Sequence, residues 1–154
     1  MKFKSIFRFF SEKSIRAILL IAIFGLALRL LFFVGIGFND DSYYLEFAET
    51  IYKGYKFTPP LYVEWGVRIA VFYPIVFFWK ILGINEFSTS IYFLLLSIGN
   101  IIFTYFLGKE LFNKKVGLVA AFLMCILPLD IIYSTQVGPE IPVQFFLQHL
   151  YSSS

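Results

Sequence analysis

The sequence has few charged residues and almost none of the side chains that build thiolate or disulfide sites. Of its 154 residues, 15% are charged, one is cysteine and one is histidine. A single cysteine excludes an intramolecular disulfide and a thiolate metal site, and Cys125 lies in an apolar run, where we interpret it as a small core residue. The sequence also lacks a phosphate-cradling glycine loop and an HExxH motif, which argues against soluble-type nucleotide chemistry.

Apolar and aromatic residues dominate instead. Hydrophobic residues make up 59% and aromatic residues 21% of the sequence, and the mean hydropathy is +0.78. These values lie far outside the range of a soluble globular domain and predict an integral membrane protein. The net charge of +3 gives no nucleic-acid signal, because the lysines and arginines stand at the edges of apolar runs, where they orient a chain in a bilayer. We therefore expect membrane lipids as partners and no nucleic acid.

Several apolar runs have the length of membrane spans. Residues 17–38, 87–107 and 116–133 are expected to span, the last interrupted towards its end by Pro128 and Asp130, and another run starts near residue 141 and is cut off at the end of the sequence. The expected fold class is therefore all-α, a multi-pass transmembrane helical protein. Residues 1–154 would form a single N-terminal transmembrane portion.

Residues 69–83 are apolar but short, and they fit either a short span or an interfacial segment. The positive-inside rule separates these alternatives. If the segment does not span, the basic N-terminal residues share the cytoplasmic face with the lysine cluster at 109–115, and the acid-rich stretch 39–86 faces outside. We prefer this arrangement. It predicts a large first extracytoplasmic loop with interfacial helices, a cytoplasmic N-terminus and a multi-pass position in the plasma membrane.

The stretch 38–54 follows the first span directly and opens with Asp40 and Asp41. A helix with one apolar face follows, capped by Asp41 or Ser42, and we expect this face to lie on the membrane surface. Adjacent carboxylates at the mouth of a span can bind a divalent cation or accept a proton from a hydroxyl. The alternative is a helix N-cap beside a solvated acid. If the chain crosses the membrane three times, both aspartates lie on the same side as Glu140. Glu140 would then either form one oxygen-ligand site with them or be a solvated loop acid.

Three cations stand near the expected outer face. Arg29 lies about two helical turns before the outer end of the first span, so we expect it to pair with Asp130 or with a lipid phosphate, and structural pairing is the preferred interpretation. Arg68 and Lys80 bracket the segment 69–83. They can hold a phosphate head group or act as interfacial anchors.

The order of these features carries a resemblance to a known family. The motifs are Arg29-Leu30 at the end of the first span, the acidic pair Asp40-Asp41 with Tyr43 nearby, the set Ala48, Ile51 and Gly54, then Tyr73-Pro74, Leu82-Gly83 and Pro139-Glu140. In this order they resemble the N-terminal region of the polyprenyl-phosphate-sugar-dependent membrane glycosyltransferases of the C-type fold. The protein O-mannosyltransferases and the lipid A aminoarabinose transferases are the most similar groups.

The resemblance implies an enzyme that transfers a sugar from a polyprenyl-phosphate donor to a lipid, glycan or protein acceptor at the outer membrane face. Its first-loop acid would act as the catalytic base or help to bind a divalent metal, Mg or Mn. Many relatives have Asp-Glu where this sequence has Asp-Asp, which leaves open which acid is functional. The expected residues are Asp40 and Asp41 for catalysis, Asp41, Glu140 and Glu64 for the metal, and Arg68, Lys80 and Arg29 for the substrate.

The sequence departs from this family in length, because the family's chains are several times longer. We therefore expect the 154 residues to be a truncated or frameshifted fragment that is inactive alone. The rival hypothesis is a small non-enzymatic multi-pass membrane protein, such as a transporter subunit or assembly factor. In that protein the acids would merely cap helices.

Overall fold

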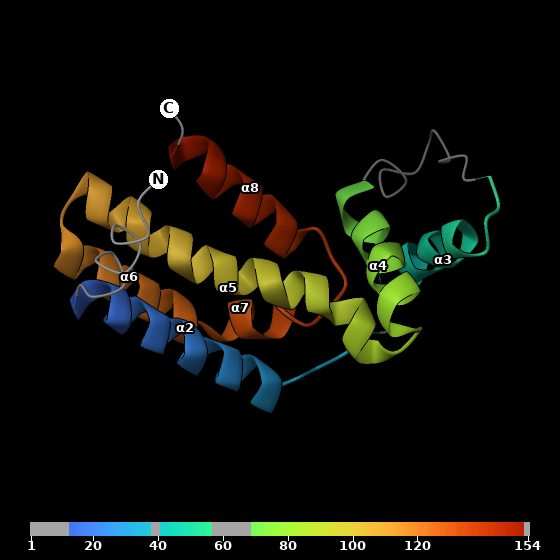
Figure 1. Cartoon of the computed structure of the whole chain (residues 1–154), viewed down its shortest axis with the longest axis horizontal. Coiled ribbons are helices and arrows are strands. Elements are labelled where there is room, and N and C mark those ends of the chain that lie inside the picture. Colours follow the sequence, from blue (N-terminus) through green and yellow to red (C-terminus); the bar gives the residue numbers. More distant parts are fainter. Residues whose placement is uncertain (1–12, 38–40, 57–68, 153–154) are drawn as a thin grey trace, which may run out of the picture.

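A computed structural model of the chain describes residues 13–37, 41–56 and 69–152, and this part of the chain is helical with no strand, as the sequence predicts. Four helices lie along one another, with a short one at their end; another helix crosses the N-terminal end of the longest one, and a further helix packs against that crossing helix (Figure 1). The bundle contains α2 (Lys13–Leu31), α5 (Glu86–Leu111), α6 (Lys114–Ile126), α7 (Pro128–Tyr133) and α8 (Glu140–Ser152), and the end group contains α3 (Asp41–Tyr52) and α4 (Ile69–Leu82).

Two helices of the described chain, α2 and α5, are long and apolar enough to cross a membrane, with 19 and 26 residues. Helix α5 contains the expected span 87–107, whereas α2 stops at Leu31 and so covers only part of the expected span 17–38. Beyond α2 the chain leaves the helical path: Val34 donates its N–H to Thr135 Oγ1 at 3.2 Å, and Gly35 has a φ of 75°. Arg29 therefore lies in the last turn of α2 rather than two turns before its end.

The expected span 116–133 is also not one helix. It is divided at Leu127 into α6, with 13 residues, and α7, with 6 residues. The cause is Pro128, which has no N–H to donate and disfavours the helical conformation at the residue before it. Leu127 accordingly has an extended backbone, with φ −65° and ψ 117°. The interruption expected from Pro128 is confirmed, and it separates the polar end of this segment from its apolar body.

A tight hairpin joins α5 to α6. The side chain of Asn113 caps α6, its Oδ1 accepting the backbone N–H groups of Lys115 and Val116, each at 3.0 Å. Just beside the turn, Gly108 and Gly117 let the two backbones approach closely, since a Cβ added to Gly117 would lie 2.9 Å from the backbone nitrogen of Lys109. Small residues at such crossings are typical of helices packed within membranes.

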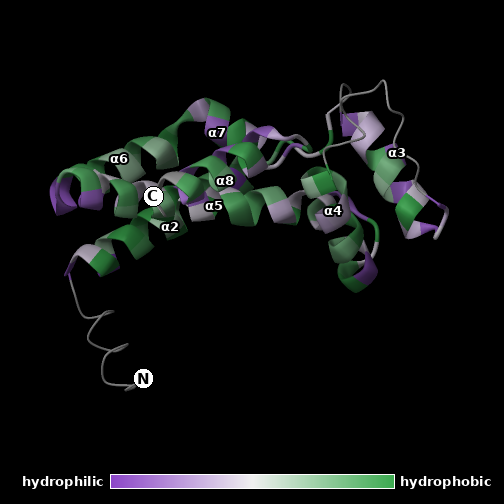
Figure 2. Ribbon diagram, turned by 90° about the horizontal axis from the view of Figure 1, so that it is seen from above, coloured by the Kyte–Doolittle hydropathy of each residue, from purple (hydrophilic) through white to green (hydrophobic). Residues whose placement is uncertain are grey.

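The apolar face of α3 packs against protein rather than against a membrane surface. Tyr44 and Ala48 are fully buried in one cluster with Phe72 of α4, and Tyr52 meets Trp79 edge to face with ring centroids 5.9 Å apart. The expectation that this face lies on the bilayer is therefore wrong, because α4 covers it. The 14-residue α4 crosses the N-terminal end of α5 (Figures 1 and 2). Whether α4 enters the membrane remains a prediction.

The outer surface of the bundle is apolar. Figure 2 shows hydrophobic colouring along most of α2 and α6. Leu20 and Ile23 on α2 are 67% and 63% exposed, and Leu123 on α6 is 58% exposed. Large apolar side chains spread over several neighbouring helices exceed what a soluble monomer exposes and are typical of helices that face lipid or further protein.

Candidate functional site

A pocket at the junction of the bundle and the end group holds two of the predicted acids. It has a volume of about 260 Å³, and Asp41 and Glu140 both line it, although they are far apart in the sequence. Its other lining residues come from α3, from the end of α7 and from the link between α7 and α8: Tyr44, Tyr133, Gln136, Val137, Gly138 and Pro139. We call this the carboxylate pocket.

The two acids of the carboxylate pocket have different surroundings. Asp41, the first residue of α3, is only 8% exposed, and its Oδ2 accepts the backbone N–H of Gly37 at 2.6 Å. A Cβ on Gly37 would lie 3.1 Å from the same oxygen, so glycine leaves room for the carboxylate. Glu140 is exposed in the first turn of α8, where the helix dipole favours a negative charge. The pocket thus combines a largely desolvated carboxylate with a solvated one.

Hydrogen bonds fix the α7–α8 link that forms one wall of the pocket. The hydroxyl of Ser90 on α5 donates to the backbone oxygen of Thr135 at 2.6 Å, and Thr135 Oγ1 accepts the N–H of Val34 at 3.2 Å. Ser134 Oγ donates to the oxygen of Ile131 at 2.6 Å. The wall is therefore attached to α5 and to the segment that leads from α2 to Asp41, which is how residues distant in sequence converge.

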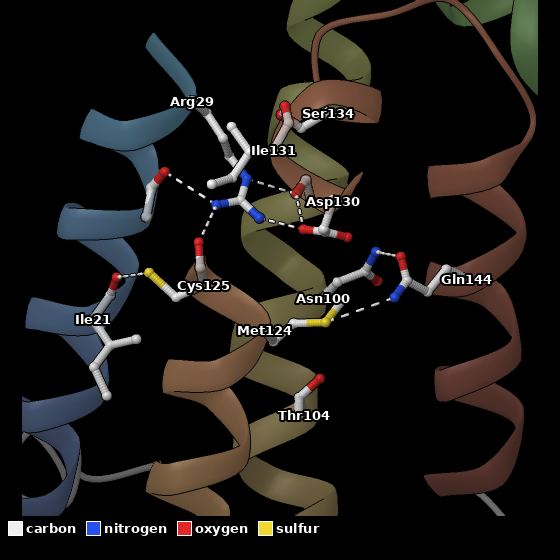
Figure 3. A network of polar contacts seen from close by, with 12 residues as sticks. Ile21, Arg29, Asn100, Thr104, Met124, Cys125, Asp130, Ile131, Ser134 and Gln144 are labelled. Atoms are coloured by element: carbon white, nitrogen blue, oxygen red, sulfur yellow. Dashed lines mark hydrogen bonds and ion pairs between the residues drawn. The ribbon is translucent and has the colours of Figure 1, made fainter. Parts of the chain in front are cut away.

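A buried ion pair lies within the bundle, in the last turn of α2 (Figure 3). The guanidinium of Arg29, which is fully buried, pairs with Asp130 and donates through Nε to Ser97 Oγ at 2.7 Å. Ser97 Oγ in turn donates to Asp130 Oδ2 at 3.0 Å. The predicted pairing of Arg29 with Asp130 is confirmed. The substrate-binding role also expected of Arg29 stays a prediction.

The helix break at Pro128 supplies a further acceptor for this network. Because the helix is interrupted at Leu127, the backbone oxygen of Cys125 has lost its helical partner, and Arg29 Nη1 donates to it at 3.2 Å. The same nitrogen also donates to the oxygen of Gly25 at 3.1 Å within α2. One arginine therefore joins α2 to α5, α6 and α7.

The remaining predicted site residues are placed elsewhere or are not described. Asp40, Glu64 and Arg68 lie outside the described residues. Lys80 is exposed in the last turn of α4 and does not line the carboxylate pocket. Among residues 13–37, 41–56 and 69–152, no group of three or more His, Cys, Asp and Glu side chains could hold a metal ion.

The donor set of the pocket fits a hydrated hard cation. Asp41 and Glu140 offer two carboxylates, and Gln136 adds a carboxamide to the same lining. Mg²⁺ commonly binds one or two protein carboxylates and keeps several waters, so these residues could hold it without a third acid. Metal binding by Asp41 and Glu140 therefore stays a prediction.

The sequence analysis missed the neutral polar residues of the pocket. No site role was predicted for Tyr44, Tyr133 or Gln136, yet all three line the carboxylate pocket. The polar break 134–142 between two apolar runs was the available signal. Loops that connect spans on the face of a predicted acid are where further site residues are expected.

A second, larger hollow lies on the other side of α3, with a volume of about 610 Å³. Glu46, Glu49 and Glu86 line it together with Trp79. Glu49 lies 2.6 Å from the amino group of Lys53, and the hydrogen bond and charge of this glutamate raise the pKa of Lys53. The pair is solvent-exposed, so we expect it to add little to stability.

Comparisons with known proteins identify the family. Residues 68–153 match the model of the family described as dolichyl-phosphate-mannose-protein mannosyltransferase. An uncharacterized protein of Aquifex aeolicus (strain VF5) is 26% identical over 130 residues, which cover 77% of this chain and 26% of that relative. The chain thus spans about a quarter of the length of this relative. No solved structure matches the chain. Because the family match covers more than half of the sequence, the chain belongs to the dolichyl-phosphate-mannose-protein mannosyltransferase family.

Proposed function

We propose that this chain contributes part of the active site of a membrane glycosyltransferase, which transfers a sugar from a polyprenyl-phosphate donor to a lipid, glycan or protein acceptor at the outer membrane face. The observation that carries the proposal is the carboxylate pocket, which Asp41 and Glu140 both line although they are far apart in the sequence. Because the match covers 26% of the Aquifex relative, the activity is proposed for a protein of full family length.

Asp41 is the residue whose surroundings suit a general base. Its carboxylate is largely withdrawn from water yet lines an open pocket, and the N–H of Gly37 orients it. In the proposed step the acceptor hydroxyl attacks the anomeric carbon and gives its proton to the carboxylate, while the bond from that carbon to the phosphate oxygen breaks. The polyprenyl phosphate leaves with the electron pair. Asp40, which lies outside the described residues, is the alternative base.

Glu140 has a different proposed role, because it is exposed and its helix begins at the pocket. Its carboxylate can hold a hydrated divalent metal together with Asp41, or orient the acceptor hydroxyl by accepting a hydrogen bond. A bound cation would supply positive charge beside the developing charge of the phosphate leaving group. Lys80 and Arg68 remain candidates for donor binding through their charge.

The distribution of charge supports the proposed outer location. The described basic residues at the start of α2 and around the α5–α6 turn share one end of the bundle, and the acids of α3, of the start of α5 and of the start of α8 gather at the other (Figure 1). The first set is Lys13, Arg16, Lys109, Lys114 and Lys115, and the second is Asp41, Glu46, Glu49, Glu86 and Glu140. Basic residues mark the cytoplasmic side of membrane helices, and the five at the first end outnumber Lys53, Lys56 and Lys80 at the other, which favours a pocket on the outer face.

The test is transfer activity in membranes that contain the protein of full family length. Asp41→Asn should lower transfer by roughly 10²- to 10⁴-fold, the usual contribution of a general base. Folding should survive, because the amide oxygen of asparagine can still accept the N–H of Gly37. Glu46→Gln is the matched control: it removes an exposed carboxylate from the same helix without touching the carboxylate pocket.

Two outcomes decide between the candidate functions. A large loss in Asp41→Asn or Asp40→Asn, with Glu46→Gln unaffected, supports the transferase and shows which acid is the base. Normal transfer in both aspartate variants contradicts the catalytic role. That result would favour a non-enzymatic membrane protein in which the carboxylate only accepts backbone hydrogen bonds.

A further inference from the structure

Polar side chains connect α8 to α5 inside the bundle. Asn100 Nδ2 donates to Gln144 Oε1 at 3.2 Å (Figure 3), and Gln148 Nε2 donates to Thr104 Oγ1 at 3.3 Å. The donors and acceptors are spaced four residues apart on both helices, so the two hydrogen bonds form successive steps of one ladder. Asn100 is fully buried in the interface between these helices.

The ladder is in line with the carboxylate pocket. Glu140 precedes Gln144 by four residues, just as Gln144 precedes Gln148, so these side chains lie on one stripe of α8. The first of them lines the pocket and the other two bond to α5. A shift of α8 by one helical turn would move Glu140 by about 5.4 Å, which would take its carboxylate away from Asp41.

Apolar packing contributes to this register on one side of α8 only. Phe145 packs over Gly99, where an added Cβ would lie 2.6 Å from the ring, so glycine allows the two helices to come close. On the other side of α8, Phe146, Leu147 and Leu150 are exposed. Lipid chains are as apolar as these exposed side chains, so this side of α8 selects no particular register in a membrane, whereas the amide hydrogen bonds on the α5 side form in one register only.

We infer that Gln144 and Gln148 are positioning residues, which set the register of α8 on α5 and thereby place Glu140 in the carboxylate pocket. The role of Glu140 rests on the proposed function. The placement itself does not, and it can be measured without any transfer reaction.

The experiment measures thiol cross-linking in the full-length protein in membranes. In a background in which Cys125 and any other cysteine of the full-length protein are replaced by serine, Asp41→Cys and Glu140→Cys form the pocket pair, which a short bifunctional thiol reagent should join. Val34→Cys and Thr135→Cys form a reference pair near the pocket wall, whose backbone N–H and side chain are already in contact. Gln144→Leu with Gln148→Leu should reduce the yield of the pocket pair several-fold, since losing two such amide pairs shifts a register equilibrium by roughly eightfold. The yield of the reference pair should stay unchanged.

Two further variants separate positioning from simple packing. Val143→Leu with Leu147→Met alters exposed positions of α8 and should leave both yields unchanged. Gln144→Asn alone should lower the yield of the pocket pair, and adding Asn100→Gln should restore it, because the exchanged amides span the same gap.

An undiminished pocket pair in the leucine variant would overturn the inference. If the cross-linking yield of the reference pair also falls in the leucine variant, the bundle itself is disturbed. The test then rests on the Gln144→Asn variant with and without Asn100→Gln. Restoration by Asn100→Gln then supports the ladder, and failure to restore overturns it. Loss of transfer activity alone leaves the cross-linking result unchanged, so failure of the proposed function is distinguishable from failure of this inference.

Discussion

Removal of one partner from the buried pair Arg29–Asp130 should be far more harmful than removal of both. Both side chains are almost completely enclosed, at 0% and 3% exposure. Asp130→Leu leaves a guanidinium in the bundle without a counter-charge, and such a change typically costs about 3–5 kcal/mol. Arg29→Met in the same chain then removes the stranded charge and leaves an apolar pair of similar size.

The structure also sets the limit of this rescue. Arg29 donates to the backbone oxygen of Cys125 and to Ser97, and methionine cannot replace these hydrogen bonds. A buried carbonyl left without a donor costs about 1–3 kcal/mol. The double variant should therefore remain less stable than the wild type but regain about 2 kcal/mol over Asp130→Leu alone.

The assay is unfolding in mixed micelles with an increasing fraction of denaturing detergent, followed by tryptophan fluorescence. Ile23→Met, added to Asp130→Leu, is the matched control. It changes an exposed position of α2, the helix that carries Arg29, and should restore none of the lost stability. A double variant less stable than Asp130→Leu would refute the reasoning, because it would mean that Arg29 stabilises the bundle mainly through its other contacts.

Two further substitutions test the packing that places the pocket. Gly117→Ala should cost about 1–3 kcal/mol in the same unfolding assay, because its Cβ would press on the backbone of α5 near Lys109; a neutral effect would show that the α5–α6 hairpin is looser than described. Trp79→Phe should cost about 1–2 kcal/mol, since it removes the 2.9 Å hydrogen bond from Nε1 to Thr89 Oγ1 and some buried volume. Thr89→Val should cost less in the phenylalanine background than in the wild type, because only the 2.8 Å hydrogen bond from Thr89 Oγ1 to the oxygen of Asn85 is then left to lose. An equal cost in both backgrounds would contradict the importance of the tryptophan bond.

The sequence predicted those features that depend on interactions between residues close together in the chain. The helix that starts at Asp41 and stops before Gly54, the long span of α5 and the interruption at Pro128 all follow from capping, periodicity and proline chemistry, and the structure has all three. The Arg29–Asp130 pair was also predictable, since two opposite charges in apolar runs have few other partners.

The remaining features depend on where distant segments meet. Residues 32–37 are as apolar as the helix before them, so their composition gives no sign that α2 ends at Leu31. The apolar face of α3 predicts that the face is buried but not what it packs against, because both lipid and α4 offer an apolar surface. Tyr133 and Gln136 enter the pocket only because hydrogen bonds to Thr135 direct the α7–α8 link. The spacing of residues in the sequence does not predict those contacts.

The most direct test of the account is the side of the membrane on which its acidic end lies. In a background in which Cys125 and any other cysteine of the full-length protein are replaced by serine, Lys53→Cys, Glu140→Cys and Lys115→Cys place single thiols on exposed positions just after α3, at the start of α8 and at the start of α6. A membrane-impermeant thiol reagent applied to intact cells should label the first two and should reach the third only after permeabilisation. Labelling of Lys53→Cys without Glu140→Cys, or the reverse, would put Asp41 and Glu140 on opposite faces and contradict a shared carboxylate pocket.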